Sequence, residues 1–241
     1  SPFLIHAVIS LISVIPTYFV VKETKELVAS KLNEKTGSSG WNLLLKPPIP
    51  TVFSTQFLTN VSRGAVFDGG VILLYPAYAY GLVPAQLGVL RGSTSAFSLP
   101  IMFATGYVMD RFGRKYTIVP GLFLTSLSMA FVAVTAFADL SVVWFIGAFI
   151  FVHVAVSIIS GNMQTLGTDV APAQARGLFF GMSRLVAQSG STASPASFGV
   201  LSATLGFGAA FTFLASTGLI AGLVVAFLLE ETLHKPEPDR K

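Results

Sequence analysis

The chain has 241 residues, of which 53% are hydrophobic and only 11% are charged, with a formal net charge of +4. Soluble domains carry roughly 25% charged residues, so these charges are too few to cover a water-facing surface, and the mean hydropathy of +0.73 indicates a chain surrounded by lipid. The absence of cysteine excludes disulfides and thiolate zinc sites, and the scatter of basic residues between apolar runs argues against nucleic-acid binding.

Seven stretches are long and apolar enough for a membrane-spanning helix, which needs about 20 residues. In chain order they are Phe3–Val21, Phe53–Tyr80, Leu87–Met109, Thr117–Phe137, Ser141–Gly161, Leu178–Leu201 and Phe207–Leu229. The runs are continuous, whereas the strands of a membrane barrel alternate between apolar and polar residues. The first run has neither the preceding basic residues nor the cleavage site of a signal peptide. The sequence therefore predicts an all-α, multi-pass membrane protein.

The segment between the first and second spans is polar and differs from the rest of the chain. It contains Gly37-Ser38-Ser39-Gly40 and ends in Lys46-Pro47-Pro48-Ile49-Pro50, a composition typical of linkers. We therefore divide the chain into a transmembrane helix (1–21), a linker (22–50), a six-helix transmembrane bundle (51–230) and a tail (231–241).

The loops alternate in charge along the chain. The linker, the loop at 110–115, Arg176 and the tail are basic, whereas the loops between them carry Asp139 as their only charge. Because cytoplasmic loops are enriched in lysine and arginine, we expect the linker, the basic loops and the tail to be cytoplasmic.

One of these basic loops carries a recognisable motif, Gly106-Tyr107-Val108-Met109-Asp110-Arg111-Phe112-Gly113-Arg114-Lys115. Gly113 permits a tight turn and Gly106 a close approach of helices. Asp110 lies at the membrane edge, where a charge needs a partner such as Arg111 or Arg114. The motif resembles the G-x-x-x-D-R-x-G-R-K signature of the major facilitator superfamily. In that family, a network of this kind latches two helix bundles together on the cytoplasmic side.

The resemblance extends over the whole chain. It implies that the first span is helix six, that the linker is the central loop, and that the remaining spans are helices seven to twelve. The run Thr168-Asp169-Val170-Ala171-Pro172 with Arg176-Gly177 resembles the loop between helices ten and eleven. This likeness places Asp169 and Arg176 in the cytoplasmic network. The chain is then the C-terminal part of a transporter whose N-terminal bundle is a further partner, and drug–proton antiporters are the most similar subfamily.

A short sequence pattern occurs twice, at the ends of two predicted spans. Phe19-Val20-Val21-Lys22-Glu23-Thr24 ends the first span and Phe227-Leu228-Leu229-Glu230-Glu231-Thr232 ends the last. Homologous half-repeats would leave this pattern at their cytoplasmic ends.

Ionisable residues inside spans are candidates for function, because each costs about 2.5–3.5 kcal/mol on insertion scales. Asp68 is the leading candidate for carrying a proton, since a change of surroundings alters a carboxylate's affinity for protons. Its alternative role is a fixed ion pair with Arg63 or Arg91. Arg63 is a poor partner for that pair, because five residues place it about 140° around the helix.

Three further residues are candidates for contact with substrate or proton, and each has a structural alternative. Arg63 shares a span with Asp68. Arg91, near the outer end of its span, either contacts the substrate or extends to the membrane surface. His153 is either a hydrogen-bonded packing residue or a proton relay. Arg184, near the cytoplasmic end of its span, is better explained as a structural anchor.

The function that these features predict is transport of a small solute by alternating access, coupled to protons, with efflux antiport favoured over uptake symport. We expect no cofactor, no metal and no nucleic-acid partner. A receptor or scaffold of the same fold that does not transport is the alternative. A membrane enzyme requires catalytic residues gathered at one depth, which the sequence does not show. A seven-helix receptor is disfavoured by the signature loop and the linker.

Overall fold

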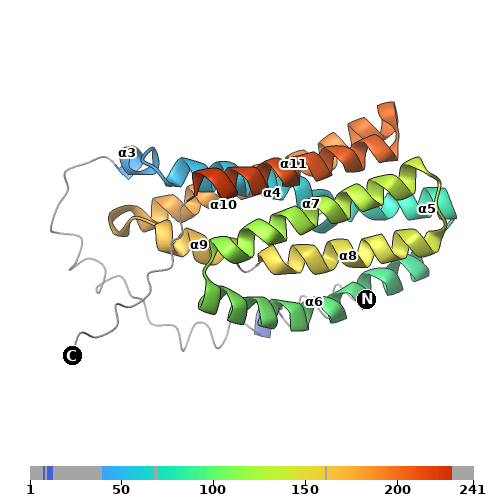
Figure 1. Ribbon diagram of the computed structural model, residues 1–241, viewed down its shortest axis with the longest axis horizontal. Coiled ribbons are helices and arrows are strands. Elements are labelled where there is room, and N and C mark those ends of the chain that lie inside the picture. Colours follow the sequence, from blue (N-terminus) through green and yellow to red (C-terminus); the bar gives the residue numbers. More distant parts are fainter. Residues whose placement is uncertain (1–7, 9, 13–39, 68–69, 161, 230–241) are drawn as a thin grey trace. The chain divides into compact units, whose positions relative to one another are not determined.

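The computed structural model describes residues 8, 10–12, 40–67, 70–160 and 162–229 (Figure 1). The chain divides into two compact units, residues 1–39 and 40–241, and the helices considered below all belong to the second. The predicted first span, most of the predicted linker, the tail and Asp68 lie outside the described residues.

The described part of the second unit is built from helices. Their bounds are α3 Gly40–Leu44, α4 Ile49–Phe67, the 3-10 helix η1 Val71–Leu73, α5 Leu74–Tyr80, α6 Pro84–Phe112, α7 Lys115–Phe137, α8 Val142–Ser160, α9 Asn162–Val170, the 3-10 helix η2 Ala173–Ala175, α10 Arg176–Leu205 and α11 Phe207–Leu228. Each of the six predicted spans from Phe53 onward corresponds to one or two of these helices.

The second predicted span is broken rather than continuous. α4 ends at Phe67, and the segment Val71–Tyr80 continues at an angle of 48° to it. Gly70, which precedes η1, has a left-handed backbone with a φ of 58°, a conformation that glycine adopts without steric cost. The break therefore falls where the sequence reads Asp68-Gly69-Gly70.

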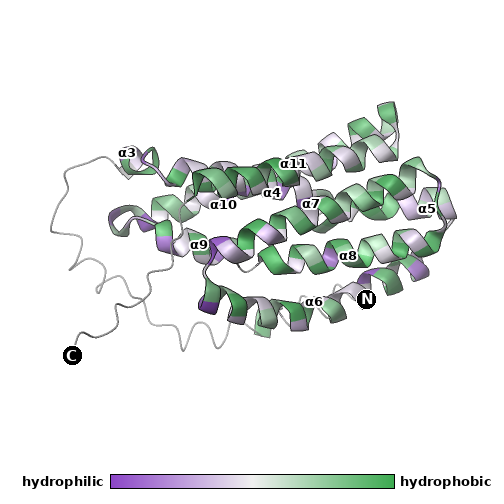
Figure 2. Cartoon of the chain, viewed as in Figure 1, coloured by the Kyte–Doolittle hydropathy of each residue, from purple (hydrophilic) through white to green (hydrophobic). Residues whose placement is uncertain are grey.

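Apolar character is unequal among the helices (Figure 2). Among the described residues, α7, the run Val142–Val170 and α11 are long and apolar enough to cross a membrane, and the bent pair α4–α5 raises the number to four. α6 and α10 are longer still, at 29 and 30 residues, but they contain many serine, threonine and glycine residues. Since only lipid-facing surfaces must be apolar, this composition suits helices with one face toward a protein or aqueous interior.

The bundle is organised around α11, which packs against α7 and α4, while α10 packs against α4 and α8 lies against both α7 and α6. A core of aromatic residues joins these helices, including the fully buried Phe145, Phe149, Phe198 and Phe211. Buried hydroxyls also connect neighbouring helices. For example, Ser126 on α7 donates a hydrogen bond of 2.6 Å to the carbonyl of Ala215 on α11.

α4 and α10 approach each other through small residues. A Cβ placed on Gly190 of α10 comes within 2.7 Å of the Phe57 carbonyl oxygen, and one on Gly64 of α4 comes within 2.8 Å of the Ser194 Cβ. The backbone N–H of Ala65 donates to the Ser194 hydroxyl at 2.8 Å. Small residues of this kind let helix backbones come close in a membrane.

Candidate functional site

The broken end of α4 is held by an arginine from α6. The Arg91 guanidinium donates from Nη1 to the carbonyl of Val66 at 2.7 Å and from Nη2 to the carbonyl of Phe67 at 3.0 Å. These carbonyls belong to the last turn of α4, where intrahelical donors are missing. A cation at the negative end of a helix dipole is favourable. Both terminal nitrogens of the Arg91 guanidinium therefore contact the end of α4.

His153 of α8 is part of the same cluster. Its side chain is only 3% exposed, its Nε2 lies 3.0 Å from Nη1 of Arg91, and its Nδ1 lies 3.0 Å from the carbonyl oxygen of Phe149. A carbonyl only accepts and a guanidinium only donates. The imidazole must therefore carry its hydrogen on Nδ1 and accept at Nε2, which makes it the neutral form. The rings of Phe67 and Phe149 also pack against the imidazole in tilted contacts, with centroids 5.1 and 4.4 Å away.

A polar cavity of about 430 Å³ lies between α4, the α8–α9 segment and α10. Its lining includes Gln56, Thr59 and Arg63 of α4, Gln164 of α9, and Ser183 and Arg184 of α10. Arg63 donates to the Asn60 side-chain oxygen from Nε at 3.3 Å and from Nη2 at 3.2 Å, and Nη1 reaches Ser160 Oγ at 3.5 Å. Across the cavity, Ser183 donates to Oε1 of Gln56 at 2.7 Å.

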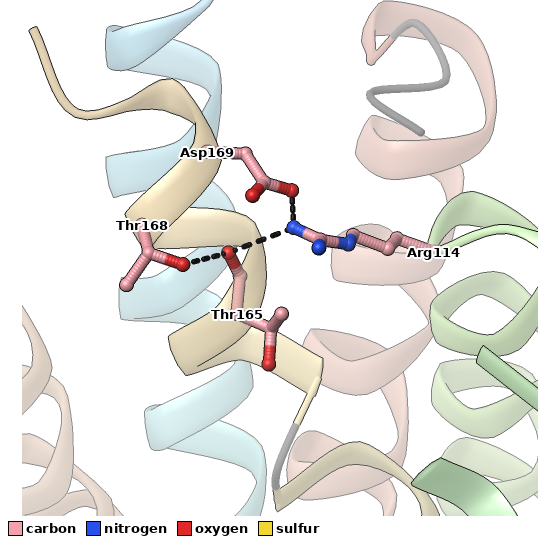
Figure 3. A network of polar contacts seen from close by, with 4 residues as sticks. All are labelled: Arg114, Thr165, Thr168 and Asp169. Atoms are coloured by element: carbon pink, nitrogen blue, oxygen red, sulfur yellow. Dashed lines mark hydrogen bonds and ion pairs between the residues drawn. The ribbon is translucent and has the colours of Figure 1, made fainter. Parts of the chain in front are cut away.

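The signature loop joins α6 to α7 and contacts α9 (Figure 3). The Arg114 guanidinium forms an ion pair with Asp169 and donates a hydrogen bond of 3.1 Å to the Thr165 carbonyl. Gly113, with a φ of 110°, ends α6 and donates its N–H to the Met109 carbonyl at 3.1 Å. The loop and α9 are thereby tied together at one end of the bundle.

The other residues of the expected network differ in their exposure. Asp110 is exposed, and within the described residues it has no hydrogen bond or ion pair, because Arg114 is engaged with Asp169 and Arg111 donates to the Tyr107 hydroxyl at 3.0 Å. Arg176 is exposed at the start of α10, and Lys115 is half-buried at the start of α7. Among the described residues, a Cβ added to Gly106 meets no atom within 4 Å, so the described helices make no close approach at Gly106.

The structure thus brings Arg91 and His153 together at the α4 break and Arg114 and Asp169 together at the loop, while Arg63 lines the cavity. Sequence reasoning missed several contacts of the arginines, among them those of Arg91 with the carbonyls of Val66 and Phe67 and those of Arg63 with the side chains of Asn60 and Ser160. The polar run Gln56, Asn60 and Arg63, spaced at four and three residues on one helix face, is the sequence signal that could have indicated the cavity.

Comparisons with known proteins agree with this architecture. The family model for the Major Facilitator Superfamily matches residues 1–195 and 53–241. Two crystal structures of a bacterial homologue of the iron transporter ferroportin are similar. The inward-facing structure has a TM-score of 0.64 and 22% identity, and the match covers 75% of this chain and 45% of that chain. The outward-facing structure has a TM-score of 0.64 and 21% identity, and the match covers 80% of this chain and 47% of that chain. No curated protein matches the sequence.

The matches confirm the predicted fold class and the predicted location in a membrane. At these identities the two structures show the fold alone, and the chain spans less than half of their length.

Proposed function

Since the chain belongs to the Major Facilitator Superfamily and is a multi-pass integral membrane protein, we propose that it forms part of a transporter that moves a small solute by alternating access. In this mechanism two bundles rock about a substrate site near the middle of the membrane. We assign this chain the second bundle, and the first bundle is a further part of the proposal.

The observation that carries the proposal is the break between α4 and α5. Discontinuous spanning helices mark substrate and ion sites in transporters, because their free backbone groups line an interior. Here the carbonyls at the end of α4 are held by Arg91, and the next residue in the sequence is Asp68. A joint of this kind permits α5 to change its angle while α4 stays packed on α10 and α11.

Proton coupling is the finer part of the proposal and rests on Asp68. A carboxylate within a span is costly to bury in its charged form, so its protonation changes with the access of water to the break. Alternation of that access binds a proton on one side and releases it on the other. Efflux antiport, in which solute and proton move in opposite directions, remains the direction that we favour over uptake symport.

The test is flux in liposomes that hold the intact protein carrying this chain. A panel of radiolabelled succinate, choline and glucose is followed under an imposed pH gradient of either sign. We expect one solute to move against the proton gradient in the native protein and this driven flux to be lost in Asp68→Asn. Asp139→Asn, in the loop between α7 and α8, is the matched control and should keep normal flux.

Each outcome decides a different part of the proposal. Normal driven flux in Asp68→Asn would remove Asp68 from the coupling. Flux that is insensitive to the pH gradient would refute proton coupling but not transport. A folded protein that moves none of the solutes, under either gradient, favours the receptor or scaffold alternative.

A further inference from the structure

We propose that His153 is a proton-binding site whose occupation releases Arg91 from the end of α4. The neutral imidazole and the guanidinium together hold the α4 break in one arrangement, and a proton on the ring favours another. The inference rests on the proposed function, because it concerns the same joint between α4 and α5. It adds a second proton-binding group, on α8, and a movement of the helices that follows from its protonation.

The first argument is that one nitrogen of Arg91 serves two acceptors. Its Nη1 donates to the Val66 carbonyl at 2.7 Å and lies 3.0 Å from Nε2 of His153. Because the Phe149 carbonyl takes the hydrogen on Nδ1, Nε2 offers its lone pair to Arg91. The contact of α6 with the end of α4 and its contact with α8 therefore share one nitrogen, so a change in the ring acts on the helix end.

The second argument is the effect of a proton on this contact. The proton binds the lone pair of Nε2, which then carries a hydrogen that faces the N–H of Nη1, and two donors form no hydrogen bond with each other. The imidazolium and the guanidinium are also like charges, and the two nitrogens are only 3.0 Å apart in the neutral arrangement. Repulsion between charges is stronger in a buried site than in water. A protonated His153 and an Arg91 bound at Val66 therefore exclude each other.

The third argument is that the helix end offers the protonated ring a partner. When Nη1 of Arg91 withdraws, the Val66 carbonyl loses that donor, and the new N–H at Nε2 of His153 can donate to it. A cation then stays at the negative end of the α4 dipole, and Nδ1 keeps its bond to Phe149. Because the ring is 3% exposed, a proton reaches Nε2 as Arg91 moves aside. Protonation and release therefore form one two-state step.

Few charged or titratable groups face the ring from the elements packed against α8. α6 contributes Arg91, and within the described part of the chain no carboxylate contacts the imidazole. α4 contributes the Phe67 ring and is followed in the sequence by Asp68, which lies outside the described residues. On α7 and α9 the charged side chains lie at the signature loop, where Asp169 forms its ion pair, and Tyr75 of α5 bonds the backbone of α7. A proton on this ring therefore acts on Arg91, and Asp68 is the group that an experiment must separate from it.

Release of Arg91 loosens the break between α4 and α5. Its Nη2 also donates to the Phe67 carbonyl at 3.0 Å, and α4 ends at this residue. Without these bonds α5 departs from its angle of 48° to α4, while α4 stays packed on α10 and α11. Because coupling between two equilibria is reciprocal, a movement of α5 away from this angle also favours the proton-bound ring.

Distances between spin labels test the inference without a measurement of flux. The intact protein is placed in nanodiscs, with any cysteines outside this chain replaced by serine. Labels are attached at Ser54→Cys of α4 and Ala79→Cys of α5, two exposed positions on either side of the break. The parent protein also carries Asp68→Asn, so that this carboxylate contributes no proton. Between about pH 8 and about pH 5, across the range in which histidine titrates, we expect the population of a second distance to rise by about tenfold.

Two variants of the parent define the ends of this response. His153→Gln keeps an acceptor for Nη1 and takes up no proton, so the distance found at high pH should persist at low pH. Arg91→Met removes the guanidinium, so the second distance should be populated at both pH values. The matched control is His234→Gln, which removes a histidine of the predicted tail and should keep the full response to pH.

Nitrogen-15 spectra of labelled histidine supply a measurement that needs no change at Arg91. In the parent protein, the protonated form of His153 should appear over the same pH range as the second distance. A ring that becomes protonated while the distance stays constant would overturn the inference. A full pH response of the distance in His153→Gln would overturn it as well.

The two proposals fail separately. A pH-dependent distance that requires His153, in a protein that moves no solute, would refute transport and leave this proton site standing. Proton-driven flux in the native protein, with a label distance that is the same at both pH values, would leave transport standing and refute this proton site.

Discussion

At the scale of single residues, the Arg114–Asp169 ion pair is the contact that ties the signature loop to α9. The two side chains are 16% and 27% exposed, so the pair is partly shielded from water and worth more than a surface pair. We expect Arg114→Gln and Asp169→Asn each to lower the free energy of unfolding by about 1–3 kcal/mol.

A double-mutant cycle measures this coupling. The combined variant should lose less than the sum of the two single losses, by about 1 kcal/mol. Arg111→Gln is the control, because Arg111 is exposed and donates its hydrogen bond to Tyr107 of its own helix. This substitution should change the free energy of unfolding by less than about 0.5 kcal/mol. Strictly additive losses would show that the pair contributes nothing.

The Arg91–His153 contact leads to a second prediction at this scale, the tautomer of His153. The geometry requires a hydrogen on Nδ1, which faces the Phe149 carbonyl, and an acceptor at Nε2, which faces Arg91. Nitrogen-15 chemical shifts of labelled histidine should show a neutral ring with Nδ1–H. Arg91→Met removes the donor at Nε2 and should shift the Nε2 resonance most. A ring with its hydrogen on Nε2 in the native protein would contradict the contact.

At the scale of elements, the close approach of α4 and α10 depends on Gly190. A methyl group at this position lies within 2.7 Å of the Phe57 carbonyl oxygen and 3.0 Å of the Asn60 Cβ, so the helices must separate to accept it. We expect Gly190→Ala to cost about 1–3 kcal/mol, which thermal unfolding in detergent would register as a lower Tm.

Gly181 provides the matched control on the same helix. A Cβ there meets no atom within 4 Å, and alanine is the better helix former by about 1 kcal/mol. Gly181→Ala should therefore leave the Tm unchanged or raise it. Equal losses in the two variants would show that glycine at 190 serves flexibility of α10 and not its contact with α4.

Element positions were largely predictable from hydropathy, and element contacts were not. The length of each apolar run placed α6, α7, α8, α10 and α11 within a few residues of their ends, because lipid demands continuous apolar helix. The same criterion missed the break after Phe67, although a run of Phe53–Tyr80 exceeds what one straight span requires. Hydropathy does not register backbone conformation, such as the left-handed φ of 58° at Gly70, the residue before η1.

The candidate site was predictable only in part, for a related reason. The free-energy cost of placing ionisable side chains inside a span identified Arg63, Arg91 and His153 as candidates. That argument did not indicate what each side chain would contact. Arg91 bonds backbone carbonyls and His153, and backbone groups leave no trace in the sequence. The partner of Arg114 was suggested by likeness of the Asp169 loop to the family, whereas the pairing of Asp110 with an arginine, expected from charge alone, is absent among the described residues.

At the scale of the whole molecule, the contacts of the signature loop and the contacts at the α4 break lie at different levels along the described helices. The signature loop, α9 and the start of α10 lie together at one end, as their ion pair and hydrogen bonds require. The α4 break, with Arg91 and His153, lies farther along α4 and α8. In the proposed mechanism, the first group of contacts serves as a latch and the break serves as a joint between rocking parts.

The orientation of this bundle in the membrane is the last prediction. The chain has no cysteine, so a single introduced cysteine reports its own position without background. Gln174 and Thr204 are both exposed and flank opposite ends of α10, about 45 Å apart at 1.5 Å per residue. Because the basic loops should be cytoplasmic, Thr204→Cys should react with a membrane-impermeant maleimide in intact cells. Gln174→Cys should react only after permeabilisation, and the reverse pattern would invert the predicted topology.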